Sequence, residues 1–308
     1  MKAYLAVLIV LGLQMSPMPA ADKKEAPKPL PQEVVKAWRD AGANVGWMDM
    51  NLHSHFSKHK FQAEGKRGKQ TPDDYWWDRT SGMQVFQFPE WEEGVLVKLP
   101  DPGAPFGLCL NLTKVTDAGL KELAGLKSLQ ALYLASNGPK TETQISDAGL
   151  KELAGLKSLQ ILDVRGTKVT DAGLKELAGL MNMQELYLTG CQVTDAGLKE
   201  LAGLMKLEVL HLGNTKVTGA GLKELAGLES LQALYLYDTP LTDAGLKHLA
   251  ALKSLRYLNL AHCSGVTDAG LKELGTLKGL KYLRLYLTKV SAAGAATLRK
   301  ELPGCNVQ

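Results

Sequence analysis

Residues 159–174 read LQILDVRGTKVTDAGL, and variants of this stretch recur through most of the chain. Its Ser or Thr before Asp-Ala-Gly-Leu returns at positions 116, 146, 170, 194, 218, 242, 267 and 291. Successive copies are separated by 30, 24, 24, 24, 24, 25 and 24 residues. A nearly constant period of this length indicates one strand-plus-helix unit that is stacked repeatedly into a solenoid.

Each unit predicts a short strand followed by a short helix. In residues 231–236 the pattern Leu-x-x-Leu-x-Leu directs Leu234 and Leu236 into the core, whereas Tyr235 and Tyr237 point to the opposite face. We expect this opposite face to be concave and exposed. The Ser or Thr that follows is the predicted helix N-cap, and the Asp after it is a first-turn charge that complements the helix dipole.

The pattern resembles the leucine-rich repeat family, and is most similar to the cysteine-containing subclass of bacterial, exported members with 24-residue repeats. The residues that carry this resemblance occupy one position in each copy, the ladder position, and are Thr113, Asn137, Thr167, Cys191, Thr215, Thr239, Cys263 and Thr288. The resemblance implies an α/β leucine-rich repeat solenoid, with a parallel concave sheet and short helices on the convex side. It also implies a scaffold that binds rather than catalyses.

We divide the chain into repeats at residues 106–290 and a C-terminal capping half-repeat at 291–308, with a last helix over Ala292 to Leu302 and a last strand over Gly304 to Val307. The 308 residues include 45% hydrophobic residues, enough for a large core distributed along the solenoid axis. The net charge of +4 is small for this length, so we expect no nucleic-acid partner.

The first residues have the pattern of a signal peptide, which we assign to 1–21. Lys2 precedes an apolar stretch from Ala3 to Leu13, and the small residues near Ala20 and Ala21 suit signal peptidase. The apolar stretch is too short for a stable transmembrane span. We therefore expect an exported protein, periplasmic or secreted, in which the Lys- and Pro-rich segment 22–31 is a linker.

Residues 32–105 form a region of different composition. All five tryptophans and all five phenylalanines lie in residues 31–106, and none follows Phe106, the residue with which the repeats begin. We expect an aromatic N-terminal cap that covers the end of the solenoid core. The pattern predicts a helix over Pro31 to Gly42 and strands over Met83 to Phe88 and Gly94 to Leu99.

The four cysteines are not expected to form disulfides. Cys191 and Cys263 share the ladder position three repeats apart, and strands that stack about 4.8 Å apart place them about 14 Å from each other. A disulfide needs Cα atoms within about 7 Å. Cys109 in the first strand and Cys305 in the terminal half-repeat are also separated by whole repeats. We interpret Cys191 and Cys263 as small buried ladder residues.

Three other features have a chemical and a plain interpretation. His53, His55 and His59 have a spacing at which imidazoles can bind zinc or copper, but no second cluster completes such a site. The basic stretch 58–69 suits an anionic surface, and the insertion 138–143 suits a recognition loop. We favour solvated surface loops for all three, and expect no metal ion, no cofactor and no catalytic residue.

The concave strand positions are the candidate ligand-binding site, because seven of the nine tyrosines lie there. Tyrosine and arginine are enriched among interface hot spots, although aromatic residues also support one another across neighbouring strands. The predicted site consists of Tyr133, Asp163, Arg165, Glu185, Tyr187, His211, Tyr235, Tyr237, Tyr257, Asn259, Tyr282, Arg284 and Tyr286, with Ile161 and Val209 in the same rows. An acid/base role for His211 beside Glu185 and Asp163 is disfavoured, since no nucleophile or metal motif accompanies them.

The leading hypothesis is a non-catalytic exported protein that binds a protein or an envelope glycan through its concave face. The alternative is a structural cell-envelope protein in which the repeats are a rigid spacer and the aromatic N-terminal region makes the contact. A metal-binding protein that uses the three histidines is a third hypothesis. The leading hypothesis predicts that replacing Tyr235, Tyr237 and Tyr257 with alanine abolishes partner capture but leaves unfolding nearly unchanged.

Overall fold

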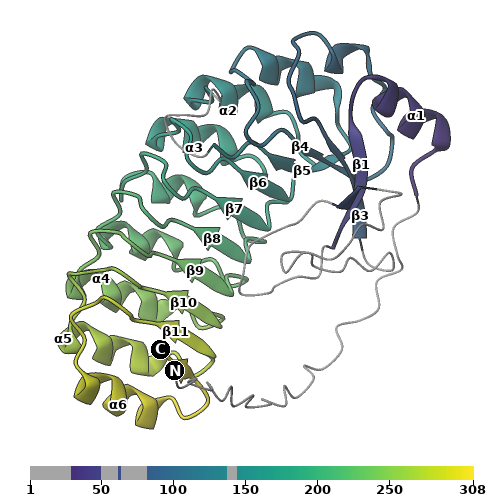
Figure 1. Ribbon diagram of the computed structural model, residues 1–308. Helices are drawn as coiled ribbons and strands as arrows, with labels where there is room; N and C mark the ends of the chain where they lie inside the picture. The colour runs from purple at the N-terminus through teal and green to yellow at the C-terminus, as the bar shows by residue number, and fades with distance from the viewer. Residues whose placement is uncertain (1–28, 50–61, 64–81, 137–143) are drawn as a thin grey trace, which may run out of the picture.

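The computed structural model describes residues 29–49, 62–63, 82–136 and 144–308. Several predictions lie outside these residues: the signal peptide 1–21, nearly all of the linker 22–31, the three histidines, most of the basic stretch 58–69 and the insertion 138–143. Within the described part, the chain forms a curved solenoid with one continuous sheet on its inner side and short helices on its outer side (Figure 1). The fold class predicted from the repeat is therefore confirmed.

The sheet contains twelve strands, which follow the chain in spatial order from β3 to β12. The repeats supply β4 (Phe106–Cys109), β5 (Leu129–Tyr133), β6 (Ile161–Asp163), β7 (Glu185–Tyr187), β8 (Val209–His211), β9 (Ala233–Tyr235), β10 (Tyr257–Asn259), β11 (Tyr282–Arg284) and β12 (Asn306–Val307). These strands are all parallel. Most have only three residues, so each repeat exposes very little backbone between its core leucines and its turn.

The outer side consists of short helices of four to ten residues, some α-helical and some 3₁₀. They are η2 (Gly119–Gly125), α2 (Asp147–Leu153), α3 (Asp171–Leu177), η3 (Leu198–Leu201), η4 (Ala220–Leu225), α4 (Asp243–Leu246), η5 (Lys247–Ala251), α5 (Asp268–Leu271), η6 (Lys272–Thr276) and α6 (Ala292–Glu301). Their leucines, such as Leu174 and Leu177, are fully buried against the strand leucines. No helix in the described ranges is long and apolar enough to cross a membrane.

The N-terminal region extends the same sheet. It contains α1 (Gln32–Asp40), β1 (Asn44–Asp49), β2 (Gln62–Ala63), β3 (Gly82–Gln87) and η1 (Leu96–Lys98). β1 is antiparallel to β2 and β3, and β3 is parallel to β4. Trp38 of α1 stacks on Phe86 with 4.3 Å between ring centroids, and both are completely buried. This aromatic packing covers the end of the leucine core, as predicted.

One predicted element of this region is wrong. Residues Gly94 to Leu99 form a 3₁₀ turn, η1, instead of a strand. The carboxylate of Glu122 in the first repeat accepts hydrogen bonds from the backbone N–H of Gly94 (2.6 Å) and Leu96 (2.9 Å). The turn buries Leu96 and exposes Val97. The apolar run 95–97 does not by itself distinguish a strand from a turn, and the hydrogen bonds to Glu122 of the first repeat stabilise the turn.

The Asp that recurs in the repeat motif has a role that becomes visible only when two neighbouring repeats are considered together. The backbone N–H and the hydroxyl of Thr194 donate to the two carboxylate oxygens of Asp171, at 2.8 and 2.6 Å, although Asp171 belongs to the preceding repeat. The same pair of bonds joins Asp117 to Ser146, Asp147 to Thr170, Asp243 to Thr267 and Asp268 to Ser291. Each Asp thus clamps its repeat to the next one, beyond the helix-dipole role that we expected.

The glycine of the motif makes room for this clamp. A Cβ atom on Gly173 would lie 2.4 Å from a carboxylate oxygen of Asp147. The hydroxyl of the predicted N-cap also accepts from the first turn of its own helix, as Thr170 does from the N–H of Ala172 (3.2 Å). The N-cap prediction is confirmed for Ser146, Thr170, Thr267 and Ser291, each of which is both cap and clamp, but it is wrong for Thr242, whose hydroxyl makes no cap hydrogen bond.

At the ladder position, Asn137 lies outside the described residues, and the cysteines and threonines other than the half-buried Thr288 are buried. The threonine hydroxyls donate to the carbonyl three residues earlier, for example from Thr215 to Leu212 at 2.6 Å. Cys191 instead donates to the carbonyl of Val164 in the preceding repeat (3.2 Å), and burial raises the pKa of its thiol to about 11. All four cysteines are unpaired, so the prediction of no disulfides is confirmed.

Candidate binding surface on the concave face

The predicted concave residues do lie together, in register across neighbouring strands. Asp163 pairs with Tyr187, Tyr187 with His211, and His211 with Tyr235 along the middle of the sheet. Tyr257 of the next strand pairs with Tyr282 in an adjacent column. The sheet therefore assembles side chains that are each separated by one repeat into continuous rows.

Most of the predicted concave residues are buried, contrary to our expectation of an exposed face. The buried members are Tyr133, Ile161, Asp163, Glu185, Tyr187, Val209, His211, Tyr235, Tyr257 and Asn259. Stacking of neighbouring rings explains part of this burial: the centroid of His211 lies 4.5 Å from that of Tyr187 and 3.7 Å from that of Tyr235, and Tyr235 lies 4.8 Å from Tyr257. Rings on adjacent strands cover one another's faces because the strands are so close.

The centre of the row holds a tightly paired set of polar groups. Arg165 donates from Nε to one carboxylate oxygen of Asp163 (2.8 Å) and from Nη2 to the other (2.6 Å), and Asp163 is only 1% exposed. The guanidinium also lies over the ring of Tyr187, 5.3 Å from its centroid. The hydroxyl of Tyr187 donates to Glu185 at 2.5 Å. This bidentate geometry fixes the side chains in one arrangement.

The pKa values of these groups are shifted in the direction that preserves the protonation states on which the hydrogen bonds depend. Burial, and next the negative charge of Glu185, raise the pKa values of Tyr133 and Tyr187 well above the ordinary 10.0. Burial also raises the pKa of Tyr235. For Arg165, burial acts to lower the pKa, but the hydrogen bonds and charge of Asp163 outweigh it and the pKa is raised. The phenols therefore remain protonated donors and the guanidinium remains charged.

The row opens at its C-terminal end. Tyr282 is 38% exposed, Tyr286 53% exposed, and Arg284 and Tyr237 are half-buried. Tyr282 pairs on one side with Tyr257 and on the other with Asn306 of β12, so only one of its two neighbours in register supplies a ring. Of the predicted site residues, these four and Arg165, whose side chain is 35% exposed, are the ones that the structure leaves accessible in substantial part, and only Arg165 lies outside the last repeats.

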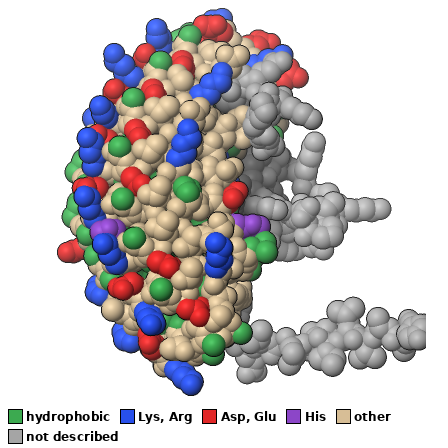
Figure 2. Space-filling view, turned by 90° about the vertical axis from the view of Figure 1, so that its left-hand side faces the viewer, with side chains coloured by type: hydrophobic (Ala, Val, Ile, Leu, Met, Phe, Trp, Pro, Cys, Tyr) green, Lys and Arg blue, Asp and Glu red, His purple; other side chains and the backbone are tan. Residues whose placement is uncertain are grey.

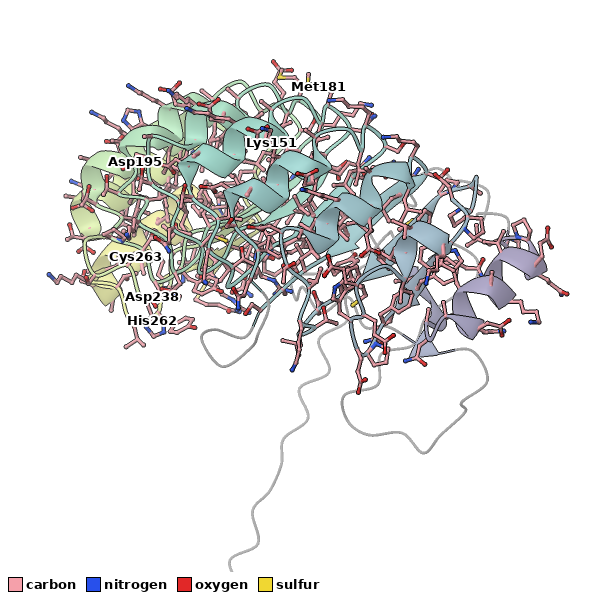
Figure 3. All side chains as sticks on the ribbon, turned by 90° about the horizontal axis from the view of Figure 1, so that it is seen from above. Lys151, Met181, Asp195, Asp238, His262 and Cys263 are labelled. Carbon is pink, nitrogen blue, oxygen red and sulfur yellow. The ribbon has the colours of Figure 1, made fainter. Side chains whose placement is uncertain are left out.

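Two further residues beside this open end were missed by the sequence reading. The residue before each ladder position adopts a left-handed conformation: Gly166 and Gly190 in the central repeats, and Asn214, Asp238, His262 and Leu287 in the later ones. Leu287 (φ 57°) is 67% exposed, and His262 (φ 62°) is exposed beside Asp238 at the same edge (Figure 3). The available signal was a bulky residue at a position where other copies have Gly, Asn or Asp.

Leucine and histidine are unfavourable in this conformation because their Cβ atoms crowd the backbone, at a cost of roughly 1–2 kcal/mol per residue. Leu112 in the first repeat shares the conformation (φ 61°) and is also exposed. What distinguishes the last repeat is the neighbouring Tyr286, whose ring meets His262 edge-on at 5.1 Å. An exposed apolar group therefore joins the accessible tyrosines at this end.

The convex face has a different character. Figure 2 shows it as an even mixture of Lys or Arg and Asp or Glu along the whole length of the solenoid. Neighbouring Lys and Glu residues of the helices lie close together. For example, Nζ of Lys199 is 3.8 Å from Oε1 of Glu200. The side chains of these Lys and Glu positions are in contact with solvent. The described residues contain no group of three or more His, Cys, Asp or Glu side chains placed to hold a metal ion. The charged rows of the convex side are therefore consistent with an ordinary solvated helix face.

The comparison with protein families agrees with the repeat architecture. The family model described as leucine-rich repeat matches residues 155–178, 179–202, 203–226 and 251–275. The chain is a leucine-rich repeat protein. The match does not distinguish the cysteine-containing subclass, which stays a prediction. No curated protein matches the chain in sequence.

Solved structures with a similar fold include bacterial leucine-rich repeat proteins. An internalin from Listeria monocytogenes is 21% identical over 68% of this chain, with a TM-score of 0.54, and the chain spans 54% of that protein's length. Internalin C2 from the same species is 25% identical over 75% of this chain and 86% of its own, with a TM-score of 0.51. A leucine-rich repeat protein of Leptospira interrogans is 24% identical over 70% of this chain and 55% of its own, with a TM-score of 0.48. The first two likenesses support the solenoid fold, a scaffold for protein interactions.

Proposed function

We propose that this leucine-rich repeat protein is an exported, non-catalytic binding protein whose last repeats bind a protein partner. One observation carries the proposal: Tyr286 and Leu287 are exposed at the C-terminal end of a concave face whose other predicted residues are mostly buried, beside the partly accessible Tyr282 and Arg284. Rigid aromatic side chains and arginine are the residues that most often dominate protein interfaces.

The binding set is smaller than the one predicted from the repeat. It keeps Tyr237, Tyr282, Arg284 and Tyr286 and gains His262 and Leu287, all at the C-terminal end. The remaining concave residues are proposed to be scaffold, because stacking and the pairing of Asp163 with Arg165 occupy them. An exposed leucine in the set favours a protein over a glycan, since an aliphatic side chain offers a sugar no hydrogen bond.

Export is proposed from the first 21 residues, whose Lys2, apolar stretch and Ala20-Ala21 have the order of a secretory signal. The alternative of a rigid spacer with an aromatic contact region has less support. Trp38, Phe86, Phe88 and Phe106 are buried in the leucine core, so they are not available for a partner.

The test is a binding measurement with stability as its control. The partner is captured from an envelope extract on the immobilised protein, identified, and titrated in purified form. Tyr286→Ala is expected to weaken binding at least about tenfold while unfolding is unchanged, because truncating an anchor at an interface commonly costs more than 1.4 kcal/mol. Tyr235→Ala, in the buried stack, is expected instead to lower the unfolding free energy by about 2–3 kcal/mol.

This expectation reverses our sequence-based one for Tyr235 and Tyr257, because both are buried. Undiminished binding by Tyr286→Ala, with the fold intact, would overturn the proposed function.

A further inference from the structure

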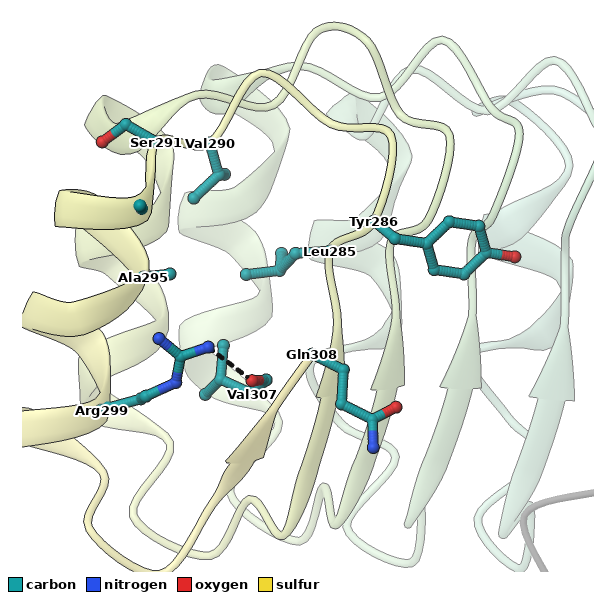
Figure 4. Close-up of a pocket in the computed structure, with 9 residues that line it drawn as sticks. Leu285, Tyr286, Val290, Ser291, Ala295, Arg299, Val307 and Gln308 are labelled. Carbon is teal, nitrogen blue, oxygen red and sulfur yellow. Dashed lines mark hydrogen bonds between the residues drawn. The ribbon is translucent and has the colours of Figure 1, made fainter. Parts of the chain in front are cut away.

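A recess of about 160 Å³ lies at the end of the solenoid, next to the proposed binding set (Figure 4). Its walls are mainly apolar and include Leu285, Val290, Ala295 and Val307. Tyr286 and Arg299 also line it. The guanidinium of Arg299 lies beside the aliphatic lining, whereas the ring of Tyr286 points away from it, to the other side of the strand (Figure 4).

The corresponding positions of earlier repeats are closed by the repeat that follows them. Val193, Val217 and Val266 occupy the position of Val290, and each is completely buried, whereas Val290 is only half-buried. The three valines belong to the continuous hydrophobic core, whereas Val290 and Ala295 only pack against its end. An aliphatic side chain is thus the group whose shape and polarity match the recess.

The basic charge of the last repeats indicates which residues should flank that side chain in the partner. Residues 252–308 contain nine Lys or Arg and three Asp or Glu, whereas the whole chain has a net charge of only +4. The positive charge is therefore concentrated in the last repeats, and the rest of the chain is slightly negative. Arg299, on α6, is exposed and donates from Nη2 to the carbonyl of Val307 at 2.8 Å. Its planar group has five N–H donors, which leaves others for a carboxylate.

We propose that the recess binds an aliphatic side chain from an acidic segment of the partner, and that Arg299 pairs with a carboxylate beside that side chain. The proposal rests on the proposed function in placing one partner across both Tyr286 and the recess. A second copy of the chain is a poorer occupant, since an end-to-end contact would bring two strongly positive ends together.

The test uses a fluorescent pentapeptide with a leucine between two pairs of aspartates, titrated with the full chain and followed by anisotropy. Matched peptides carry serine in place of leucine, or lysines in place of the aspartates. We expect binding of the first peptide only. Ala295→Phe, which fills the recess, should weaken binding at least about tenfold, as should Arg299→Glu.

The controls lie on the same helix. Ala296 and Lys300 are exposed and do not line the recess, so Ala296→Phe and Lys300→Glu should keep most of the affinity. Circular dichroism melting checks that each variant is folded. The serine peptide binding as well as the leucine peptide would overturn the proposal, and so would equal losses in test and control variants.

Sedimentation of the chain alone tests the second copy. Self-association that Ala295→Phe abolishes would assign the recess to another chain and overturn the acidic partner. The outcomes also separate the two proposals: a partner lost with Tyr286→Ala but kept with Ala295→Phe and Arg299→Glu supports the proposed function and rejects the recess.

Discussion

The centre and the C-terminal end of the concave face use similar residue types, yet their environments differ. In the centre, His211 lies between the rings of Tyr187 and Tyr235, and Arg165 is held by Asp163. At the end, Tyr282 and Tyr286 are exposed. Contacts with a neighbouring strand exist in both regions, since the ring of Tyr257 lies 6.4 Å from that of Tyr282 and 6.0 Å from the guanidinium of Arg284. The exposed fraction of the side chain, and not the residue type, therefore decides which tyrosine is a candidate contact.

The strongest way to break this comparison is to remove one arginine from each region. Arg165→Met should lower the unfolding free energy by about 3 kcal/mol, because the nearly inaccessible carboxylate of Asp163 loses its bidentate partner. Arg284→Met should change it by less than about 1 kcal/mol, since Arg284 is only half-buried. Urea titration of both variants measures the difference. Equal losses would mean that the two regions are not distinct.

A smaller effect should separate the Asp clamps of the two regions. The carboxylate of Asp195 accepts from Thr218, Gly219 and Gly221, whereas Asp268 bonds to Ser291 at the exposed end. Asp195→Ala should lower the unfolding free energy by about 1 kcal/mol, a value reduced for partial exposure. Asp268→Ala should lower it less, because water replaces the lost bonds more easily.

The same clamp predicts a dependence on pH. Burial alone would raise the pKa of Asp195, but the hydrogen bonds from Thr218, Gly221 and Gly219 outweigh it and lower the pKa below the ordinary 3.8. A lowered folded-state pKa means that the stabilisation is complete above the unfolded-state value and is lost as the pH falls through the folded-state value. Unfolding measured from pH 6 to pH 2 should therefore show a shallower acid loss for Asp195→Asn than for the natural chain. An identical acid profile would contradict this role of the clamp.

Much of the fold could be predicted from local sequence patterns, whereas the burial of the candidate site residues could not. The period of about 24 residues predicted the strands, and strand spacing was enough to exclude a disulfide between Cys191 and Cys263. Alternation along a strand indicates which face Tyr235 takes, but not how closely the rings of adjacent strands cover it. The role of Asp171 was hidden for a similar reason: its partner Thr194 lies 23 residues away, in the next repeat.

The smallest expected effect sharpens the comparison by using both ends of the solenoid. Leu112 and Leu287 are exposed leucines at the same turn position, and both have a left-handed backbone. Replacing either with glycine should raise the unfolding free energy by about 0.5–1 kcal/mol, since relief of crowding exceeds the entropy that glycine loses on folding. If the C-terminal end binds the partner, Leu287→Gly should also weaken binding, whereas Leu112→Gly should not. Calorimetric unfolding together with titration of the purified partner measures both quantities. Equal effects of the two variants on binding would show that the exposed leucine beside Tyr286 has no special part in recognition, because the strain and the exposure are shared and only the neighbouring tyrosine differs.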